Sequence, residues 1–237
     1  MTAERPGPSE VAAPPNVVGL RSMVAVCAHP DDESFGLGAV IDSLTAAGTS
    51  TAVLSFTHGE ASRLHGAAGD LGVVRATELA AAARALMVSD VLLLDHADGA
   101  LPGIDLDILV DDVVRYATAV GAGGFLVFDL GGITGHPDHQ RATEAALHAG
   151  ERLNLAVIAW SIPASVADSL NAAFGTAFAG RTEAEIDIVL RVDRSAQKRA
   201  IALHASQATD NPVLWRRLEL LGDTECLRWL RRPSVTG

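Results

Sequence analysis

The sequence predicts an α/β fold, with a mostly parallel sheet and helices on both faces. Short apolar segments rich in valine alternate with segments of helical length over most of the chain. The short segments are apolar on both faces, which is typical of strands that are buried between two layers of helices. An alternation of this kind indicates parallel strands joined by helical crossovers.

The first elements follow directly from this pattern. Residues 23–28 (MVAVCA) form the first predicted strand, and a helix over 36–47 follows it. Gly48 ends this helix, because glycine readily adopts the left-handed conformation found at helix ends. A second strand over 51–56 leads into a polar, glycine-containing loop over 57–70.

The middle of the chain continues the alternation. In chain order, the expected elements are a helix at 71–87, a strand at 91–94, a helix at 104–120, a strand at 125–128, a helix at 137–149 and a strand at 155–160. The helix at 71–87 is rich in alanine, the residue with the highest helix propensity. Together these elements predict a Rossmann-like sheet.

The last third is less regular. Residues 185–192 alternate apolar and polar side chains, so we expect a strand with one face in contact with water. Helices are expected at 195–206 and 213–221, and a short closing element at 225–230.

The length and composition predict one large domain. A chain of 237 residues with 49% apolar residues can bury a full core, and we expect this domain to span residues 20–237. Residues 1–19 contain several prolines and acidic residues and are expected to form a flexible arm. The sequence leaves the oligomeric state open, and a homo-oligomer is compatible with it.

The charge balance excludes some partners. The chain has 18 basic and 29 acidic residues, a net charge of −11, whereas nucleic acids and anionic membranes bind basic surfaces. No apolar stretch reaches the roughly 20 residues that span a bilayer, and no signal peptide is recognised. We expect a cytoplasmic protein in which Cys27 and Cys226 are buried, reduced thiols.

Two clusters of histidine and carboxylate residues carry the chemistry. His29-Pro30-Asp31-Asp32-Glu33 follows the first predicted strand, and His136-Pro137-Asp138-His139 follows the fourth. In an open parallel sheet, ligands bind at the carboxyl ends of the strands, and crossovers commonly make these two strands neighbours. We therefore expect the two clusters to form one site.

The residue types indicate a hydrolytic metal site. A cation held by His29, Asp32 and His139 would keep a fourth position for water and lower the pKa of that water. Asp31 is then free to accept and return a proton, and a protonated His136 can stabilise an oxyanion. Pro137 suits the first position of a helix, which makes His136 the N-cap residue. These roles describe the hydrolysis of an amide or an ester.

The paired motifs AHPDDE and GHPDH resemble those of the PIG-L/LmbE-like deacetylases, zinc-dependent enzymes that remove N-acetyl groups from amino sugars. The likeness extends from about Met23 to beyond Gln207. It implies an LmbE-like fold and a small N-acylated amino sugar or glycoside as substrate. It also implies Zn²⁺ as the cofactor, although two nitrogens and one carboxylate suit Fe²⁺ as well.

The resemblance also assigns roles to residues. It makes His29, Asp32 and His139 the metal ligands, Asp31 the general base, and His136 the acid or the oxyanion-stabilising group. Arg75, Asp98 and His204 match residues that contact substrate. Arg75 could instead form a surface ion pair with Glu78, and His204 could instead cap a helix end. Glu33 and Asp138 are expected behind the ligands, where Glu33 would orient a ligand histidine or cap a helix.

One residue departs from the pattern. Actinobacterial sugar deacetylases of this kind often carry a tyrosine at the position of Thr134, and Tyr116, the only tyrosine here, lies in a different predicted helix. Two alternatives remain open: an amidase that cleaves a larger sugar–thiol conjugate, and a catalytically silent sugar-binding protein.

Overall fold

The computed structural model describes residues 9–11, 19–63 and 70–234. Its strands are β1 (Ser9–Val11), β2 (Ser22–Cys27), β3 (Ser50–Thr57), β4 (Asp90–His96), β5 (Gly124–Phe128), β6 (Ala156–Ser161), β7 (Ile188–Arg191) and β8 (Thr224–Arg231). Its helices are α1 (Asp32–Phe35), α2 (Gly38–Ala46), α3 (Leu71–Ala85), α4 (Leu106–Val120), α5 (Gly132–Gly135), α6 (Pro137–Leu153), α7 (Ala164–Phe174), α8 (Ser195–Leu203), α9 (Ala205–Ala208) and α10 (Pro212–Leu221). Two 3₁₀ turns, Leu101–Gly103 and Glu183–Glu185, complete the described elements.

The strands form one sheet in the order β1-β7-β8-β6-β5-β2-β3-β4. All neighbouring strands are parallel except β8, which runs antiparallel to both β6 and β7. The β2 strand lies between β3 and β5, with Val24 opposite Phe125. The strand order therefore changes direction between β2 and β5, which is where doubly wound folds bind ligands. The predicted mostly parallel α/β fold is confirmed, and so is the predicted adjacency of the first and fourth strands.

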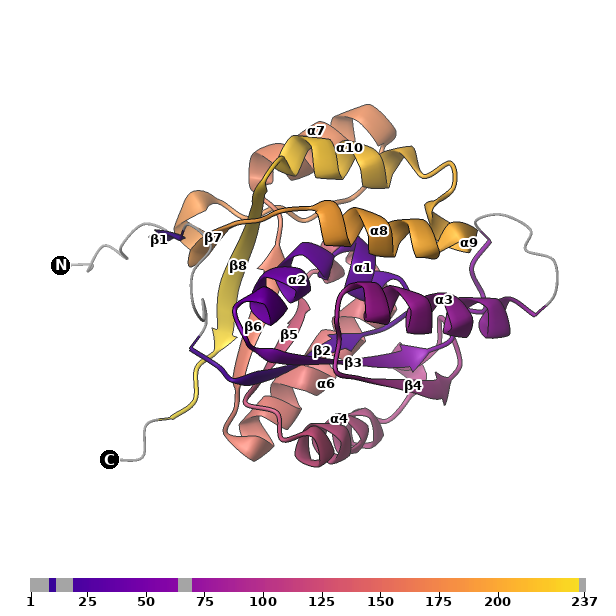
Figure 1. Cartoon of the computed structure of the whole chain (residues 1–237), viewed down its shortest axis with the longest axis vertical. Coiled ribbons are helices and arrows are strands. Elements are labelled where there is room, and N and C mark those ends of the chain that lie inside the picture. The colour runs from indigo at the N-terminus through magenta and orange to yellow at the C-terminus, as the bar shows by residue number, and fades with distance from the viewer. Residues whose placement is uncertain (1–8, 12–18, 64–69, 235–237) are drawn as a thin grey trace.

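Two hydrophobic cores cover the two faces of the sheet. Met23, Ala25 and Cys27 of β2 contribute to one core, and Val24 and Val26 contribute to the other, because successive side chains of a strand point to opposite faces. In Figure 1, α1, α2, α3 and α8 cover one face, while α4 and α6 cover the other. Both cysteines are buried and free, as expected.

The C-terminal third differs most from the expectation. The predicted helix over 195–206 is divided into α8 and α9 at His204, whose φ of −90° and ψ of 54° are not helical. The α7 helix was not predicted, although Val166, Ala167 and Leu170 form a buried face on it. Part of the predicted arm, Ser9–Val11, pairs with β7 as an edge strand, and residues 1–8 and 12–18 lie outside the described residues.

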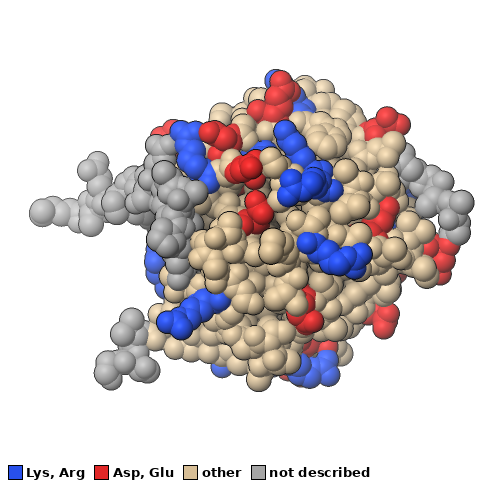
Figure 2. Space-filling view, viewed as in Figure 1, with Lys and Arg blue, Asp and Glu red and all other residues tan. Residues whose placement is uncertain are grey.

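The surface agrees with the acidic composition. On the face shown in Figure 2, acidic and basic side chains are interspersed. A nucleic-acid-binding surface instead gathers its basic residues on one face. Within the described residues, we find no helix of the length and apolarity that crossing a membrane requires.

Candidate active site

The two histidine clusters meet at the carboxyl ends of β2 and β5. His29 and Asp32 follow β2, and Asp32 begins α1. The second cluster begins α6, where His136 is the N-cap residue and Pro137 takes the first helical position, as predicted. The adjacency of β2 and β5 joins the clusters, although they are more than one hundred residues apart in the chain.

Three potential ligand atoms face one another. Nε2 of His139 lies 3.1 Å from Nδ1 of His29 and 3.1 Å from Oδ1 of Asp32. Oδ2 of Asp32 accepts hydrogen bonds of 3.0 Å from the backbone N–H groups of Ala28 and His29. These bonds fix the carboxylate and leave Oδ1 directed at the histidines.

Hydrogen bonds on the far side of each ring set the tautomers. Nε2 of His29 lies 3.0 Å from Oδ1 of Asp98 and 3.3 Å from Oδ2 of Asp138, so this nitrogen carries the hydrogen. Nδ1 of His139 lies 3.2 Å from the carbonyl oxygen of Gly132 and is likewise a donor. In the neutral form of each ring, the two nitrogens that face each other are therefore the ones with lone pairs.

This arrangement fits a divalent metal ion. Two lone pairs and a carboxylate oxygen at this spacing repel one another unless a cation lies between them. Ligand atoms at 2.0–2.2 Å from a tetrahedral ion are about 3.3 Å apart, close to the 3.1 Å separations found here. His29, Asp32 and His139 would hold the ion.

The charges of these groups favour the same conclusion. Burial lowers the pKa of His29, but the hydrogen bonds to Asp138 and Asp98 raise it to about 10. Burial raises the pKa of Asp32, but His139 and His29 lower it by more, so Asp32 is ionised. The pocket between them therefore attracts positive charge, as a proton or as a metal ion.

Asp138 and Asp98 both act on His29. Oδ2 of Asp138 also accepts a hydrogen bond of 2.7 Å from the backbone N–H of Gly99, and Oδ2 of Asp98 accepts one of 2.9 Å from Ala61. Asp138 thus lies behind a ligand, as expected. Asp98 lines the cavity but also orients His29, a contact that the sequence did not reveal.

Asp31 has an unusual backbone and a raised pKa. Its φ is 121°, a value that side-chain-bearing residues rarely adopt and that costs of order 1–3 kcal/mol. Burial and the neighbouring Asp32 raise the pKa of Asp31, Arg75 lowers it, and the result is about 6. A carboxyl group with such a pKa can accept and release a proton near neutral pH.

Arg75 holds Asp31 in this position. Its Nη2 lies 3.0 Å from Oδ2 of Asp31 and donates to the carbonyl oxygen of Pro30, while Nη1 donates to that of Gly59 at 2.7 Å. Arg75 is only 3% exposed, and Glu78 instead accepts hydrogen bonds from Ser206. The alternative of a surface Arg75–Glu78 pair is therefore wrong. Arg75 also belongs to the wall of the cavity described below, so the expected contact with the sugar stays a prediction.

Glu33 and His204 form a buried pair outside the cavity. Nε2 of His204 lies 2.7 Å from Oε1 of Glu33, and both side chains are fully buried. Oε2 of Glu33 accepts a hydrogen bond of 2.9 Å from the backbone N–H of Asp31. The expectation that Glu33 orients a ligand histidine is therefore corrected: Glu33 binds His204, which is not among the candidate ligands, and holds the strained backbone of Asp31. The expected sugar contact by His204 is corrected as well, because His204 is not among the residues that line the cavity.

His136 faces the cavity as a neutral donor. Its Nδ1 accepts a hydrogen bond of 3.2 Å from the backbone N–H of Asp138, so Nε2 carries the hydrogen. Burial and the nearby His139 and His29 lower the pKa of His136. The sequence suggested a protonated group, whereas the structure favours a neutral imidazole that donates an N–H.

A cavity of about 460 Å³ extends from these residues. Sequence reasoning missed Phe35, Trp160 and Arg217 in its wall. Of these three, only Trp160 could have been expected in the wall from the sequence, because it lies near the carboxyl end of a predicted strand. Thr134 lines the cavity, while the hydroxyl of Tyr116 bonds to Asp90 on the opposite face of the sheet. No described tyrosine therefore replaces the one missing at Thr134.

The loop over 57–70 is described only in part, since residues 64–69 lie outside the described residues.

The sequence is similar to known deacetylases. Residues 24–150 match the PIG-L family model, which is described as GlcNAc-PI de-N-acetylase. A 1D-myo-inositol 2-acetamido-2-deoxy-alpha-D-glucopyranoside deacetylase of Salinispora arenicola is 31% identical, in an alignment that covers 82% of this chain and 79% of that protein. The deacetylase of the same name from Kineococcus radiotolerans is 31% identical, in an alignment that covers 60% of this chain and 48% of that protein.

Solved structures share the fold. N,N'-diacetylchitobiose deacetylase from Pyrococcus horikoshii has a TM-score of 0.68 and 20% identity, covering 91% of this chain and 85% of that one. Teicoplanin deacetylase Orf2, in a zinc-inhibited form, has a TM-score of 0.66 and 19% identity over 91% of this chain and 100% of that one. The hydratase GalB from Pseudomonas putida also matches, with a TM-score of 0.62 and 19% identity over 92% of this chain and 98% of that one, so the fold alone does not decide the reaction.

The matches to the family model and to the Salinispora relative decide the assignment, because both are matches of sequence and the family model spans both histidine clusters. The resemblance seen in the AHPDDE and GHPDH motifs is confirmed: the chain belongs to the PIG-L family and is a hydrolase of the de-N-acetylase type.

Proposed function

We propose that this protein removes the N-acetyl group from a small glycoside of an N-acetylated amino sugar, with Zn²⁺ held by His29, Asp32 and His139. The observation that carries the proposal is the 3.1 Å approach of two histidine lone pairs beside an ionised carboxylate. The relatives support the substrate class, because their names describe deacetylases of glucosamine-containing glycosides. Imidazole nitrogens with one carboxylate suit Zn²⁺ best among common ions, with Fe²⁺ as the competitor.

The residues around the ligands divide the remaining work. When bound, the ion supplies Lewis acidity, which polarises the amide carbonyl and lowers the pKa of water. Asp31 takes the proton from the attacking water, since its carboxyl group has a pKa of about 6 and lies beside the ligands. The same group then returns the proton to the departing amine. Product acetate and a free amino sugar result.

His136 stabilises the negative charge that develops on the carbonyl oxygen. Its Nε2–H faces the cavity because its Nδ1 is occupied by the backbone of Asp138. A neutral donor fits this role, as the hydrogen bond strengthens only when charge develops on the oxygen. One aligned donor of this kind raises kcat by a factor of about 10²–10³.

The test is a panel of N-acetylated amino-sugar glycosides assayed for free amine after the purified protein has been loaded with Zn²⁺ or Fe²⁺. We expect amine release with at least one member, and none after chelation. Asp31→Asn is the control for contaminating activity. Release of amine at equal rates by wild type and Asp31→Asn would contradict the proposal. Cleavage only of a larger thiol-bearing conjugate would favour the amidase alternative, and binding without release would favour the silent binding protein.

A further inference from the structure

A buried arginine belongs to the wall of the cavity. Arg217 of α10 is 9% exposed and belongs to the cavity wall together with the candidate ligands. Its Nη2 donates to the carbonyl oxygen of Phe35 at 2.5 Å, and its guanidinium carbon lies 5.1 Å from the ring centroid of Trp160. Nε of Arg217 is buried and has no hydrogen-bond partner among the described residues.

Arg217 lacks the counter-charge that comparable arginines have. Arg75, the other arginine of the cavity wall, is paired with Asp31 at 3.0 Å, and the buried Arg194 is paired with Glu225 at 2.5 Å. None of the ion pairs found among the described residues includes Arg217.

The nearby carboxylate is already in use. Glu225, followed by Asp31 and Asp32, raises the pKa of Arg217, but the two oxygens of Glu225 bind Arg194 and Nε1 of Trp160, and neither aspartate forms an ion pair with Arg217 among the described residues. Burial lowers the pKa of Arg217 to about 10, which leaves the guanidinium charged at neutral pH. A buried charge without a partner is costly, and a bound anion would offset that cost.

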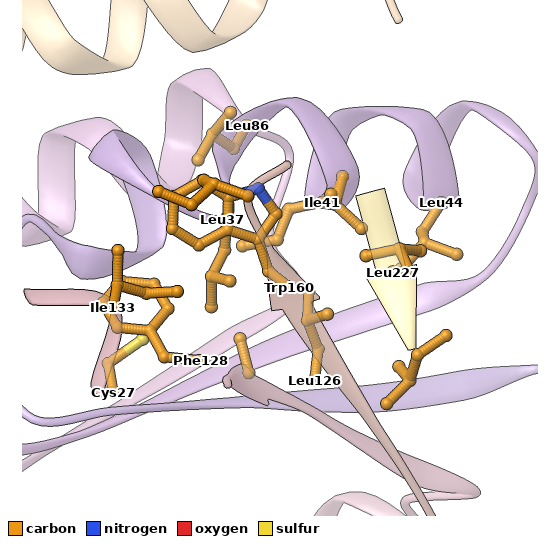
Figure 3. Close-up of a cluster of buried hydrophobic side chains, with 14 of the residues drawn as sticks. Cys27, Leu37, Ile41, Leu44, Leu86, Leu126, Phe128, Ile133, Trp160 and Leu227 are labelled. Atoms are coloured by element: carbon orange, nitrogen blue, oxygen red, sulfur yellow. The ribbon is translucent and has the colours of Figure 1, made fainter. Parts of the chain in front are cut away.

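An aromatic surface connects this arginine to the candidate metal ligands. The ring centroid of Phe128 lies 4.9 Å from that of His139 and 5.4 Å from that of Trp160. Figure 3 shows Phe128 and Trp160 on the same side of the sheet, close to Ile133 and Leu37. Gly36 permits this packing, because a Cβ there would lie 2.4 Å from the ring of Phe128.

We propose that Arg217 binds a carboxylate or phosphate group on the aglycone of the substrate, while the N-acetyl group lies at His29, Asp32 and His139. This inference rests on the proposed function and names the substrate more narrowly. A guanidinium offers parallel N–H donors that match both kinds of anion, and its remaining donors are not taken by carboxylates of the protein. Between these groups a sugar or a linker can contact Phe128, which is 8% exposed and lies beside His139, whereas Trp160 is only 1% exposed and supports Phe128 from behind.

The test uses three 2-acetamido-2-deoxyglucosides that differ only in the aglycone: 2-hydroxyethyl, carboxymethyl and 2-phosphoethyl. We measure kcat and KM by amine release for wild type, Arg217→Met and Arg217→Lys. Wild type is expected to favour at least one anionic glycoside over the neutral one by about tenfold or more in kcat/KM, mainly through KM. Arg217→Met removes this preference, and Arg217→Lys restores part of it because a single ammonium cannot form the paired contact.

A neighbouring arginine supplies the matched control. Arg216 is exposed on the same helix and pairs with Glu219, so Arg216→Met should keep the wild-type preference. The preferred anion, carboxylate or phosphate, identifies the natural group. Equal kcat/KM for all three glycosides in wild type, or an unchanged preference in Arg217→Met, would overturn the inference.

Failure of the proposed deacetylase function can be distinguished from failure of the anion site. If wild type releases no amine from any of the three glycosides, their dissociation constants are measured by calorimetry on metal-loaded wild type and Arg217→Met. Tighter binding of an anionic glycoside, lost in Arg217→Met, supports the anion site even when the hydrolysis is wrong. Equal binding of all three refutes it. Circular dichroism on each variant confirms that it is folded.

Discussion

Nδ1 of His29 and Nε2 of His139 lie 3.1 Å apart and face each other. Each ring is held in this orientation from behind, His29 by Asp98 and Asp138 and His139 by the carbonyl oxygen of Gly132. The backbone bonds of Asp32 bring a carboxylate to the same point. This relationship defines the site and leads to the first prediction.

Removal of a ligand should abolish metal binding. We expect His139→Ala to lose the bound ion, because only two ligand atoms remain, whereas wild type carries about one ion per chain. Elemental analysis after dialysis measures the content. His148→Ala is the control, since His148 is a half-exposed residue of the same helix. Equal metal content in the two variants would show that His139 is not a ligand.

Loss of the general base Asp31 should lower activity without loss of the bound metal. Asp31→Asn is expected to retain the metal and to have a kcat that is lower by a factor of about 10²–10⁴, the range typical of general acid–base catalysis. Amine release and elemental analysis on the same sample check both parts. Asp168→Asn, at an exposed position of α7, should leave both unchanged. Undiminished turnover in Asp31→Asn would remove Asp31 from its proposed role.

The acid side of the pH profile should depend on Arg75. Burial raises the pKa of Asp31 and the Arg75 cation lowers it, with a result of about 6. The base works when it is ionised, so activity falls as the pH drops through this pKa. Arg75→Met removes the cation, raises the pKa and moves the fall in kcat/KM to higher pH. Gly59→Ala should act in the same direction, because its Cβ would lie 2.2 Å from Nη1 of Arg75. An unmoved profile in both variants would contradict this assignment.

A buried ion pair should make stability depend on pH. Asp129 is 1% exposed, binds Nε and Nη2 of Arg181 at 2.7 and 3.0 Å, and accepts a hydrogen bond from Ser161. Burial raises its pKa, but Arg181, Ser161 and Arg228 lower it by more. The pKa of Asp129 in the folded protein therefore lies below its value of about 3.9 in the unfolded chain. Its contribution to the free energy of unfolding is complete above that pH and is lost as the pH falls through the folded pKa.

Asp129→Asn is therefore expected to lower the free energy of unfolding by about 2–3 kcal/mol at pH 7, since Arg181 is left without its carboxylate. The difference from wild type should narrow below about pH 4, because Asp129 of the unfolded wild-type chain then binds a proton that the folded protein still excludes. Urea unfolding at pH 7 and near pH 3.5 measures both values. If the difference in free energy of unfolding between wild type and Asp129→Asn is the same at both pH values, the charge of Asp129 does not contribute to stability.

The local signals predicted a large part of this molecule. Strand and helix alternation is a property of neighbouring residues, so β2 to β6 and most of the helices between them could be placed in advance. The same holds for His136 and Pro137, whose positions at the start of α6 follow from local backbone preferences. The broken helix at His204 could not be foreseen, because the buried carboxylate of Glu33 that binds this histidine is 171 residues away.

By itself the sequence determined the α/β fold, the two clusters and their meeting at the ends of β2 and β5. The fold and the clusters depend on apolar periodicity and on short turns, which act within a few residues, whereas the meeting of the clusters was expected from the usual strand order of doubly wound sheets. Only the tertiary structure decided what each charged side chain contacts: Arg75 with Asp31, Glu33 with His204, and Arg217 beside Trp160 with no carboxylate of its own. Those contacts arise when separate helices pack on one sheet edge, and burial then makes each unpaired charge costly enough to require a partner.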